Sequence, residues 1–376
     1  MNEDKKLKIN IIGDIFSTTG YASHTRNLVN ALYKIADVKL STQLMQGWER
    51  MVNDNELDMI TKQGKENDIQ IIITTPHMWK LFLGTGINCA YCVWEGSKVP
   101  LSYIDEMLNP KIDLIFVPSE HTKQAIENTI NDYEKEIMTS TQGLEILDKI
   151  KVIPHGVDLS IFKSLEKKHD KFTFVCNKGW RGSSWDRGGV QYMIKAFNEE
   201  FTMEDNIRLI VRLNPAYISP QMLQQSVQQL NLQANKADIQ VMLENVPYDK
   251  LCDFYNLGDA YICPTRSEAF DLGSGEAMAC GLPVIATNYG GQIEHMDSTC
   301  ALFVDAELSE VKEDIMYEGI EWATIVINDL RKKMRWCYEH QDRVKEMGLK
   351  AKEFITIFTW NNSANRIIES IKQLFN

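Results

Sequence analysis

The sequence predicts an α/β protein made of two doubly wound, Rossmann-like domains. Short apolar runs alternate with segments whose apolar residues recur every three or four positions, as in strands that alternate with helices. The runs are nearly continuous, which is typical of parallel strands buried on both faces. With 376 residues, the chain is also too long for one ordinary core, so its length favours two domains.

Two series of apolar runs are predicted to be strands. The first series lies at Lys8–Gly13, Ile69–Thr75, Asn88–Val93, Leu114–Pro118 and Lys151–Ile153. The second lies at Phe172–Asn177, Arg208–Leu213, Ile239–Leu243, Ala260–Cys263, Pro283–Ala286 and Ala301–Val304. Helical spacing occurs between the predicted strands Phe172–Asn177 and Arg208–Leu213. One predicted buried stripe there contains Val190, Met193, Ile194 and Phe197.

The boundary between the domains is predicted near residues 160–169. The turn-rich segment Pro154-His155-Gly156-Val157-Asp158 comes first, and the charged stretch 166–170 is the best linker candidate. The predicted domains are residues 1–163 and 164–355. Residues 356–376 are expected to form a C-terminal helix that packs back on the first domain, with Asn362 or Ser363 as its cap.

Composition and charge exclude several classes of protein. Hydrophobic residues make up 44% and charged residues 24%, the mixture of a soluble globular chain. No apolar run approaches the roughly 18–20 residues of a membrane helix, and the first residues contain no apolar signal-peptide region. We therefore expect a cytoplasmic protein with eight reduced cysteines and no stable membrane insertion. The net charge of −12 argues against nucleic acid as a binding partner, although a nucleic acid could still be an acceptor substrate.

The strongest functional signal is the segment Ala260–Gly291. A buried strand leads into a polar, glycine-bearing loop, and a short helix is predicted to start near Glu276 and end at Gly281. Such a loop lies at the carboxyl end of its strand, where open α/β sheets bind ligands, and a helix N-terminus suits phosphate. Glu268 and Glu276 would flank that phosphate site. This pattern suits a ligand with hydroxyl groups on both sides of a diphosphate, which is a nucleotide sugar.

The same segment resembles the donor site of retaining glycosyltransferases of the GT-B fold, family GT4, also called glycosyl transferases group 1. The resemblance rests on Glu-x7-Glu followed by Ala-Met-Ala-x-Gly-x-Pro-Val-Ile. Other family segments follow in the expected order: a glycine loop and helix at Gly20-Tyr21-Ala22-Ser23-His24, PxGVD at 152–158, RKG…AF at 185–197, and the C-terminal crossover at Phe358-Thr359-Trp360. The resemblance covers nearly the whole chain and implies two Rossmann-like domains that face a cleft.

The resemblance also implies roles for individual residues. Glu276 would bind the ribose hydroxyls of the donor, and Glu268 would be a catalytic residue that holds the hydroxyls of the transferred sugar. Gly20 would be the donor-binding position in the N-terminal glycine loop. The backbone N–H groups that would contact the diphosphate or sugar lie in the loop at Phe270, Asp271, Leu272, Gly273 and Ser274.

The leaving diphosphate needs a positive charge, and cationic side chains are the expected source. Metal-dependent transferases often use an Asp-x-Asp pair, which does not occur in this sequence. We therefore expect no metal and no cofactor besides the donor itself, a UDP- or GDP-sugar. Arg181 and Arg187 are candidate catalytic cations and Lys178 a candidate donor-binding cation. The family's Lys position falls on Gly188 or Arg187, depending on the register.

The sequence departs from the family in two places. The usual Glu-Gly-Phe-Gly ends here in Asp271, which adds a carboxylate beside the proposed diphosphate. Many members carry a histidine after the strand that ends near residue 93, where this chain has Glu95, so Glu95 is the candidate for that acceptor-facing role. His77 is a further candidate at a strand end. For His24, after the glycine loop, a structural and a functional interpretation both stay open.

The function predicted from the sequence is retaining transfer of a sugar from a nucleotide sugar to a hydroxyl group of a glycan, protein, lipid or nucleic acid. Two alternatives share the fold: a nucleotide-sugar epimerase and a non-catalytic subunit that binds nucleotide sugars.

Cys89-x-x-Cys92 lies in a predicted strand, where residues three apart point to opposite faces, so it is interpreted as structural. Gly13 and Gly20 do not form a GxGxxG pattern, which disfavours a dinucleotide dehydrogenase.

Overall fold

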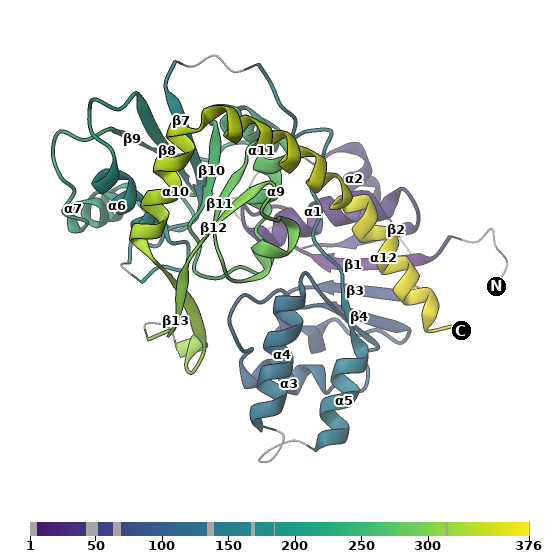
Figure 1. Cartoon of the computed structure of the whole chain (residues 1–376). Coiled ribbons are helices and arrows are strands. Elements are labelled where there is room, and N and C mark those ends of the chain that lie inside the picture. Colours follow the sequence, from purple (N-terminus) through teal and green to yellow (C-terminus); the bar gives the residue numbers. More distant parts are fainter. Residues whose placement is uncertain are drawn as a thin grey trace. The chain divides into compact units, whose positions relative to one another are not determined.

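The computed structural model describes residues 6–42, 52–62, 69–133, 139–166, 170–183, 185–312 and 315–375. The chain forms two compact units (Figure 1). Unit 1 contains Met1–Gly156 and Phe358–Asn376, and unit 2 contains Val157–Ile357. The boundary predicted after residue 163 therefore falls inside unit 2, and residues 167–169 of the candidate linker lie outside the described residues.

Unit 1 is built on a six-stranded parallel sheet with strand order β2-β1-β3-β4-β5-β6. Its strands are β1 (Lys8–Gly13), β2 (Asp37–Ser41), β3 (Ile69–Ile73), β4 (Ile87–Tyr91), β5 (Leu114–Val117) and β6 (Ile150–Val152). Its helices are α1 (Gly20–Tyr33), α2 (Asp54–Thr61), α3 (Leu101–Met107), α4 (Glu120–Tyr133), α5 (Ser140–Lys149) and α12 (Trp360–Gln373), with a 3₁₀ turn η1 (Pro76–Leu81). The strands predicted in this half are confirmed within two residues at each end, and β2 is additional.

The C-terminal helix α12 belongs to unit 1, where it packs on α1. The Ser363 hydroxyl donates a hydrogen bond of 2.6 Å to the carbonyl oxygen of Pro154. The predicted cap at Asn362 or Ser363 is wrong, because the helix starts earlier. Thr359 has extended backbone angles, and its hydroxyl accepts the Asn362 N–H at 3.2 Å.

Unit 2 has a second six-stranded parallel sheet, with strand order β12-β11-β10-β7-β8-β9. Its strands are β7 (Phe172–Lys178), β8 (Ile207–Leu213), β9 (Asp238–Leu243), β10 (Ala260–Cys263), β11 (Val284–Thr287) and β12 (Ala301–Val304). Its helices are α6 (Val190–Glu200), α7 (Pro220–Gln229), α8 (Leu251–Tyr255), α9 (Leu272–Ala279), α10 (Ile327–Glu339) and α11 (Gln341–Phe354). The 3₁₀ turns are η2 (Tyr248–Lys250), η3 (Gly291–His295), η4 (Ile315–Tyr317) and η5 (Ile355–Ile357). In this half too, each predicted strand is found within one residue of its predicted ends.

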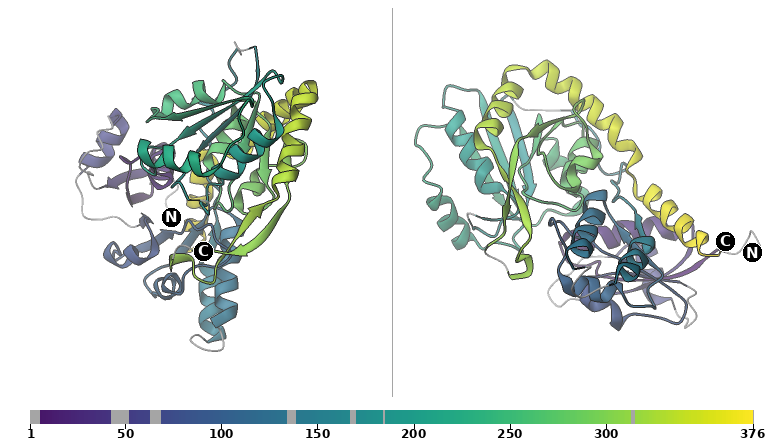
Figure 2. Two further views of the ribbon diagram at one scale, coloured as in Figure 1. Left: turned by 90° about the vertical axis from the view of Figure 1, so that its left-hand side faces the viewer. Right: turned by 60° about the horizontal axis from the view of Figure 1, so that its bottom comes forward.

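An antiparallel hairpin of β13 (Ala306–Glu310) and β14 (Glu321–Ile325) follows β12. Figure 2 shows that this hairpin extends away from the six-stranded sheet of unit 2. Neither strand was predicted, because the exposed residues of β13 include Glu307 and Leu308 and give no apolar run.

The core of unit 2 explains why α6 lies where it does. The predicted stripe on α6 is confirmed, since Val190, Met193, Ile194 and Phe197 are at most 1% exposed. The Phe197 ring packs against the ring of Phe201, with centroids 5.0 Å apart. Val190, the first residue of α6, is also fully buried, which fixes the start of α6 and the end of the loop that joins β7 to it. Among the described residues, no helix is both long and apolar enough to cross a membrane.

Candidate functional site

The polar residues with the strongest sequence signal gather in unit 2, where β7 and β10 end. These two strands are parallel neighbours, so the loops that follow them start at the same edge of the sheet. Lys178 is the last residue of β7, and Arg187 lies in the loop that leads to α6. Glu268 lies in the segment between β10 and α9. The topology alone therefore brings these three side chains into one cluster.

Glu268 is the centre of this cluster. Its Oε1 accepts hydrogen bonds from Lys178 Nζ and the Thr265 hydroxyl, each at 3.2 Å, and its Oε2 accepts one from Arg187 Nη1 at 2.9 Å. Arg187 Nη1 also donates to the carbonyl oxygen of Ser267 at 2.8 Å. Burial alone would raise the pKa of Glu268, but the charges of Arg187 and Lys178 outweigh it and lower that pKa below its ordinary value. Glu268 is therefore ionised at neutral pH and positioned as a strong acceptor.

Asp271 forms the second half of the cluster. Its Oδ1 accepts a hydrogen bond from Lys178 Nζ at 2.6 Å, and its Oδ2 accepts from the Cys263 thiol at 2.9 Å and from the Ser274 N–H at 3.3 Å. Burial would lower the pKa of Lys178, but Asp271 and Glu268 raise it well above its ordinary value. Lys178 is thus a buried, charged group that joins two carboxylates.

Helix α9 starts at Leu272, so the prediction of a start near Glu276 is wrong. The reason is the cap: Asp271 adopts a φ of 67°, and its carboxylate accepts the Ser274 N–H. The predicted donor-binding positions Phe270, Asp271, Leu272, Gly273 and Ser274 therefore form the cap and first turn of α9. Anions bind at helix N-termini, and here the Asp271 carboxylate accepts one of the first-turn N–H groups, that of Ser274.

Glu276 lies inside α9 rather than at its start, and it is 6% exposed. The Tyr255 hydroxyl donates a hydrogen bond of 2.6 Å to its Oε2. Burial raises the pKa of Glu276 to about 8, and Asp271 adds to this, while Tyr255 and Arg212 oppose it. Glu276 is therefore mostly protonated at neutral pH.

Tyr255 also connects Glu276 to two residues that sequence reasoning missed. The Asn177 side-chain amide donates to the Tyr255 hydroxyl at 2.9 Å, and Arg212 Nη1 donates to Asn177 Oδ1 at 2.8 Å. Asn177 and Arg212 are register partners on β7 and β8. The available signal was therefore a pair of polar residues near the ends of adjacent strands.

The chain was compared with a family model and with solved structures. Residues 179–316 match the family model described as "Glycosyl transferases group 1", a span that contains Arg187, Glu268 and Glu276. The whole chain superposes on sucrose-phosphate synthase from Thermosynechococcus elongatus with a TM-score of 0.68 and 16% identity, covering 98% of this chain and 99% of that one. It also superposes on Anabaena HepE, solved with UDP-glucose, with a TM-score of 0.67 and 12% identity, covering 98% and 100%. The chain therefore has the GT-B fold, and residues 179–316 match glycosyl transferases group 1.

Three curated relatives align with this chain over part of its length. D-inositol 3-phosphate glycosyltransferase of Paenarthrobacter aurescens is 26% identical over 253 residues, which are 64% of this chain and 55% of that protein. The protein of the same name from Segniliparus rotundus is 27% identical over 166 residues, 42% of this chain and 36% of that protein. Lipopolysaccharide 1,2-N-acetylglucosaminetransferase of Salmonella typhimurium is 24% identical over 287 residues, 71% and 68% of the two chains. The match thus spans about half the length of the first of these relatives, and a third of the second.

The loop before α6 contains the candidate catalytic cations predicted from the sequence. A Cβ atom on Gly188 would lie 2.3 Å from the carbonyl oxygen of Gly179, so this backbone leaves no space for a side chain there. Arg187, whose side chain is 34% exposed, reaches Glu268 instead. The other candidate, Arg181, is exposed, and its backbone N–H donates to Asp186 at 2.9 Å. Arg187 and Lys178 therefore lie in the cluster, and a role for Arg181 stays a prediction.

His295 contacts the residues at the start of α9. Its ring stacks on Phe270 with centroids 4.4 Å apart, and its Nε2 bonds the Ser274 hydroxyl at 2.7 Å. Burial lowers the pKa of His295 to about 4, so the ring is neutral at physiological pH. The loop between Glu268 and α9 is therefore held by packing on a residue outside the motif.

The remaining candidates lie in unit 1. Gly20 begins α1, next to its Thr19 cap. Glu95 follows β4 and is half-buried, and its backbone oxygen bonds His121 Nε2 at 2.7 Å. His77 is exposed on η1, with its Nε2 3.3 Å from the Thr75 hydroxyl. The catalytic roles of His77 and Glu95 stay predictions.

His24 is buried in the core of unit 1. Its ring centroid is 4.3 Å from those of Tyr91 and His155, and 5.7 Å from that of Trp360. Burial lowers the pKa of His24 well below its ordinary value, and His155 lowers it further. Of the two interpretations left open by the sequence, this packing favours the structural one.

Two further observations concern ligands. Within the described ranges, no three His, Cys, Asp or Glu side chains come together in a way that could hold a metal ion, and metal independence stays a prediction.

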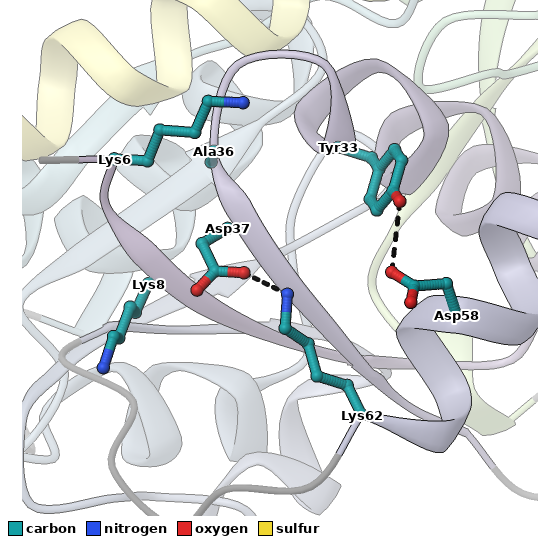
Figure 3. Close-up of a pocket in the computed structure, with 7 residues that line it drawn as sticks. All are labelled: Lys6, Lys8, Tyr33, Ala36, Asp37, Asp58 and Lys62. Atoms are coloured by element: carbon teal, nitrogen blue, oxygen red, sulfur yellow. Dashed lines mark hydrogen bonds and ion pairs between the residues drawn. The ribbon is translucent and has the colours of Figure 1, made fainter.

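Figure 3 shows a surface pocket of unit 1 that is lined by Lys6, Lys8, Tyr33, Ala36, Asp37, Asp58 and Lys62. Lys62 pairs with Asp37, and the Tyr33 hydroxyl donates to Asp58. Because Lys8 and Asp37 are the first residues of their strands, this pocket lies at the amino ends of the strands, away from the carboxyl edge.

Proposed function

We propose that this GT-B protein is a glycosyltransferase of family GT4 that transfers a sugar from a nucleotide sugar to a hydroxyl acceptor with retention of configuration. The observation that carries the proposal is the carboxylate of Glu268, kept ionised by Arg187 and Lys178 beside the N-terminus of α9. The structural neighbour HepE was solved with UDP-glucose and with UDP, which supports a UDP-sugar as the first donor to test. A GDP-sugar is the second.

The cluster offers each part of such a donor a matching group. The first-turn N–H groups of α9 and the Arg187 guanidinium suit the diphosphate, because anions bind at helix N-termini and to planar guanidinium groups. Glu268, whose side chain is 20% exposed, can accept hydrogen bonds from sugar hydroxyls. Glu276, bonded to Tyr255, can accept those of the ribose.

In the proposed reaction, the bond between the sugar and the diphosphate oxygen breaks as the acceptor hydroxyl attacks from the same face. The departing phosphate oxygen takes the acceptor proton. Arg187 stabilises the negative charge that develops on the diphosphate, and its fixed position means that little reorganisation is needed. No residue of the cluster is proposed as a covalent nucleophile. The acceptor is a hydroxyl group of a glycan, protein, lipid or nucleic acid.

The direct test is a panel of UDP-, GDP- and ADP-sugars incubated with the protein, with release of nucleoside diphosphate as the readout. We expect release with one donor class, and a loss of at least 100-fold in Arg187→Ala, as for removal of a transition-state donor. Arg343→Ala is the matched control, because Arg343 is exposed on α11 and pairs with Glu346. If every donor is inert, or if both variants behave alike, the proposal fails.

A non-catalytic subunit that binds nucleotide sugars is the second candidate, and Asp271 favours it. A carboxylate at the α9 N-terminus weakens the attraction for a diphosphate. Such a protein would bind a donor with no turnover in any acceptor mixture. An epimerase of the same fold would change the sugar with no acceptor present, which NMR of the nucleotide sugar detects.

A further inference from the structure

The position of Asp271 has a consequence for the proposed donor site, and the inference that follows rests on that proposed function. Three positive or donating groups that a phosphate could use already point at this carboxylate. They are the Lys178 ammonium at 2.6 Å, the Cys263 thiol at 2.9 Å and the Ser274 N–H of α9 at 3.3 Å. Asp271 is 8% exposed, so it interacts with these groups out of bulk water.

The backbone indicates that this placement is specific. Asp271 adopts φ 67°, a region that costs a residue with a Cβ atom roughly 1 kcal/mol or more and that glycine adopts freely. The chain therefore tolerates a strained residue at the cap of α9. What the side chain adds at that position is the cap hydrogen bond to Ser274 and a negative charge beside Lys178.

The charges of the cluster then decide how it treats anions. Lys178 and Arg187 are two cations, and Glu268 and Asp271 are two carboxylates, so the cluster is balanced before any ligand binds. A free nucleoside diphosphate carries about one negative charge more than the corresponding nucleotide sugar, because its terminal phosphate group has a second ionisation near pH 6. A fixed carboxylate nearby therefore penalises the free diphosphate more than the sugar nucleotide.

We propose that Asp271 is a specificity-determining residue that disfavours the nucleoside diphosphate product relative to the nucleotide-sugar donor. Its carboxylate shares the Lys178 ammonium and the α9 N-terminus with the bound diphosphate. It thereby weakens product binding and lets the spent nucleotide leave. With glycine at position 271, no carboxylate would compete with the ligand for Lys178 and the N-terminus of α9.

Asp271→Asn isolates the charge. Asparagine has the same shape, caps helices about as well as aspartate and is among the residues that best tolerate positive φ, so folding is preserved. The matched control is Asp329→Asn on α10. Asp329 has a similar environment, since it accepts Lys333 Nζ at 2.6 Å and the Asp305 N–H at 2.8 Å. Asp271→Gly is the second variant, which removes both the charge and the strain.

The experiment is isothermal titration of wild type and variants with UDP, GDP and the matching sugar nucleotides at pH 7.5. We expect Asp271→Asn to tighten binding of the free diphosphate by about tenfold or more, and binding of the sugar nucleotide clearly less. The gain is lost when Lys178→Met is added, and Asp329→Asn changes neither affinity. Equal gains for both ligands, no gain, or weaker binding in both Asp271 variants overturns the inference. If wild type and all variants bind no nucleotide at all, it is the proposed function that fails.

Discussion

Tyr255 and Glu276 form a buried hydrogen bond of 2.6 Å that links the short helix α8 to the interior of α9. The bond holds a carboxyl group whose pKa burial raises to about 8. Glu276 is thus fixed in direction while it is mostly uncharged at neutral pH. This pair decides how stability and donor binding depend on pH.

Stability should fall with rising pH because of Glu276. The folded protein binds this proton more tightly than the unfolded chain, so the stabilisation is fully present below the ordinary pKa of a glutamate. It is lost as the pH rises from there through about 8. Glu276→Gln is neutral at every pH and should become more stable than wild type by on the order of 2 kcal/mol at pH 8.5. Thermal unfolding at pH 5.5 and 8.5 tests this; a pH-independent difference between the two proteins contradicts it.

Tyr255→Phe should weaken donor binding more than turnover. The variant keeps the ring packing but removes the hydrogen bond that orients Glu276, the residue proposed to bind the ribose. We expect the KM for the donor to rise about 5- to 10-fold, since one hydrogen bond to a buried carboxyl group is lost, with kcat changed less than twofold. Tyr338→Phe, which removes a hydroxyl that accepts the Asn206 N–H, is the control. A fall in kcat with an unchanged KM would show that Tyr255 has another role.

Arg187→Lys should lose most of the activity although it keeps the charge. The guanidinium contacts Glu268 and the Ser267 carbonyl oxygen through the same nitrogen, and a lysine lacks the planar set of donors that fits a phosphate as well. We expect kcat/KM to fall by at least tenfold in Arg187→Lys and further in Arg187→Ala. Steady-state kinetics with the active donor measure this. Full activity in Arg187→Lys would mean that a point charge is sufficient.

Gly188→Ala should disturb the donor-site loop. The added Cβ would lie 2.3 Å from the Gly179 carbonyl oxygen, so the loop that carries Arg187 has to move. We expect a lower melting temperature, from a loss of about 1–3 kcal/mol, and weaker donor binding. Gly20→Ala is the contrast for folding, since a Cβ there meets no atom within 4 Å. Equal melting temperatures of the two variants would contradict this account of the loop.

Most of the two sheets could be predicted because their strands are continuous apolar runs. Strand β2 escaped prediction, since only Val38 and Leu40 of its residues are buried and the apolar run is broken at every second position. The hairpin β13–β14 escaped for a similar reason. Strand β13 buries few residues. The hairpin is therefore defined by the pairing of β13 with β14 and not by a run of apolar side chains.

The start of α9 was predicted too late because of its glycines. Gly273 and Gly275 look like loop residues, but both lie inside the helix. A Cβ on Gly273 would be 2.7 Å from the Tyr261 hydroxyl oxygen, and one on Gly275 would be 2.9 Å from a Val157 methyl group. These glycines allow close packing and do not mark a turn. Contacts made by residues distant in the sequence cannot be read from the local pattern.

The candidate site was predictable only in part. Glu268 and Arg187 were identified from the motif, and the structure brings them together. Tyr255 was missed, because a tyrosine in a short amphipathic helix gives no sign of its partner. The pairing of Lys178 with Asp271 was missed as well, since the residues are distant in the sequence and meet only when β7 and β10 lie side by side.

The central claim is that the cluster around Glu268 and Glu276 binds a nucleotide sugar. The most direct measurement is calorimetric titration of UDP- and GDP-sugars into wild type, Glu268→Gln and Glu276→Ala. The account predicts saturable binding of one donor by wild type and at least tenfold weaker binding in each variant, while all three proteins unfold cooperatively. Absence of binding to every donor, or equal affinity in the three proteins, would contradict it.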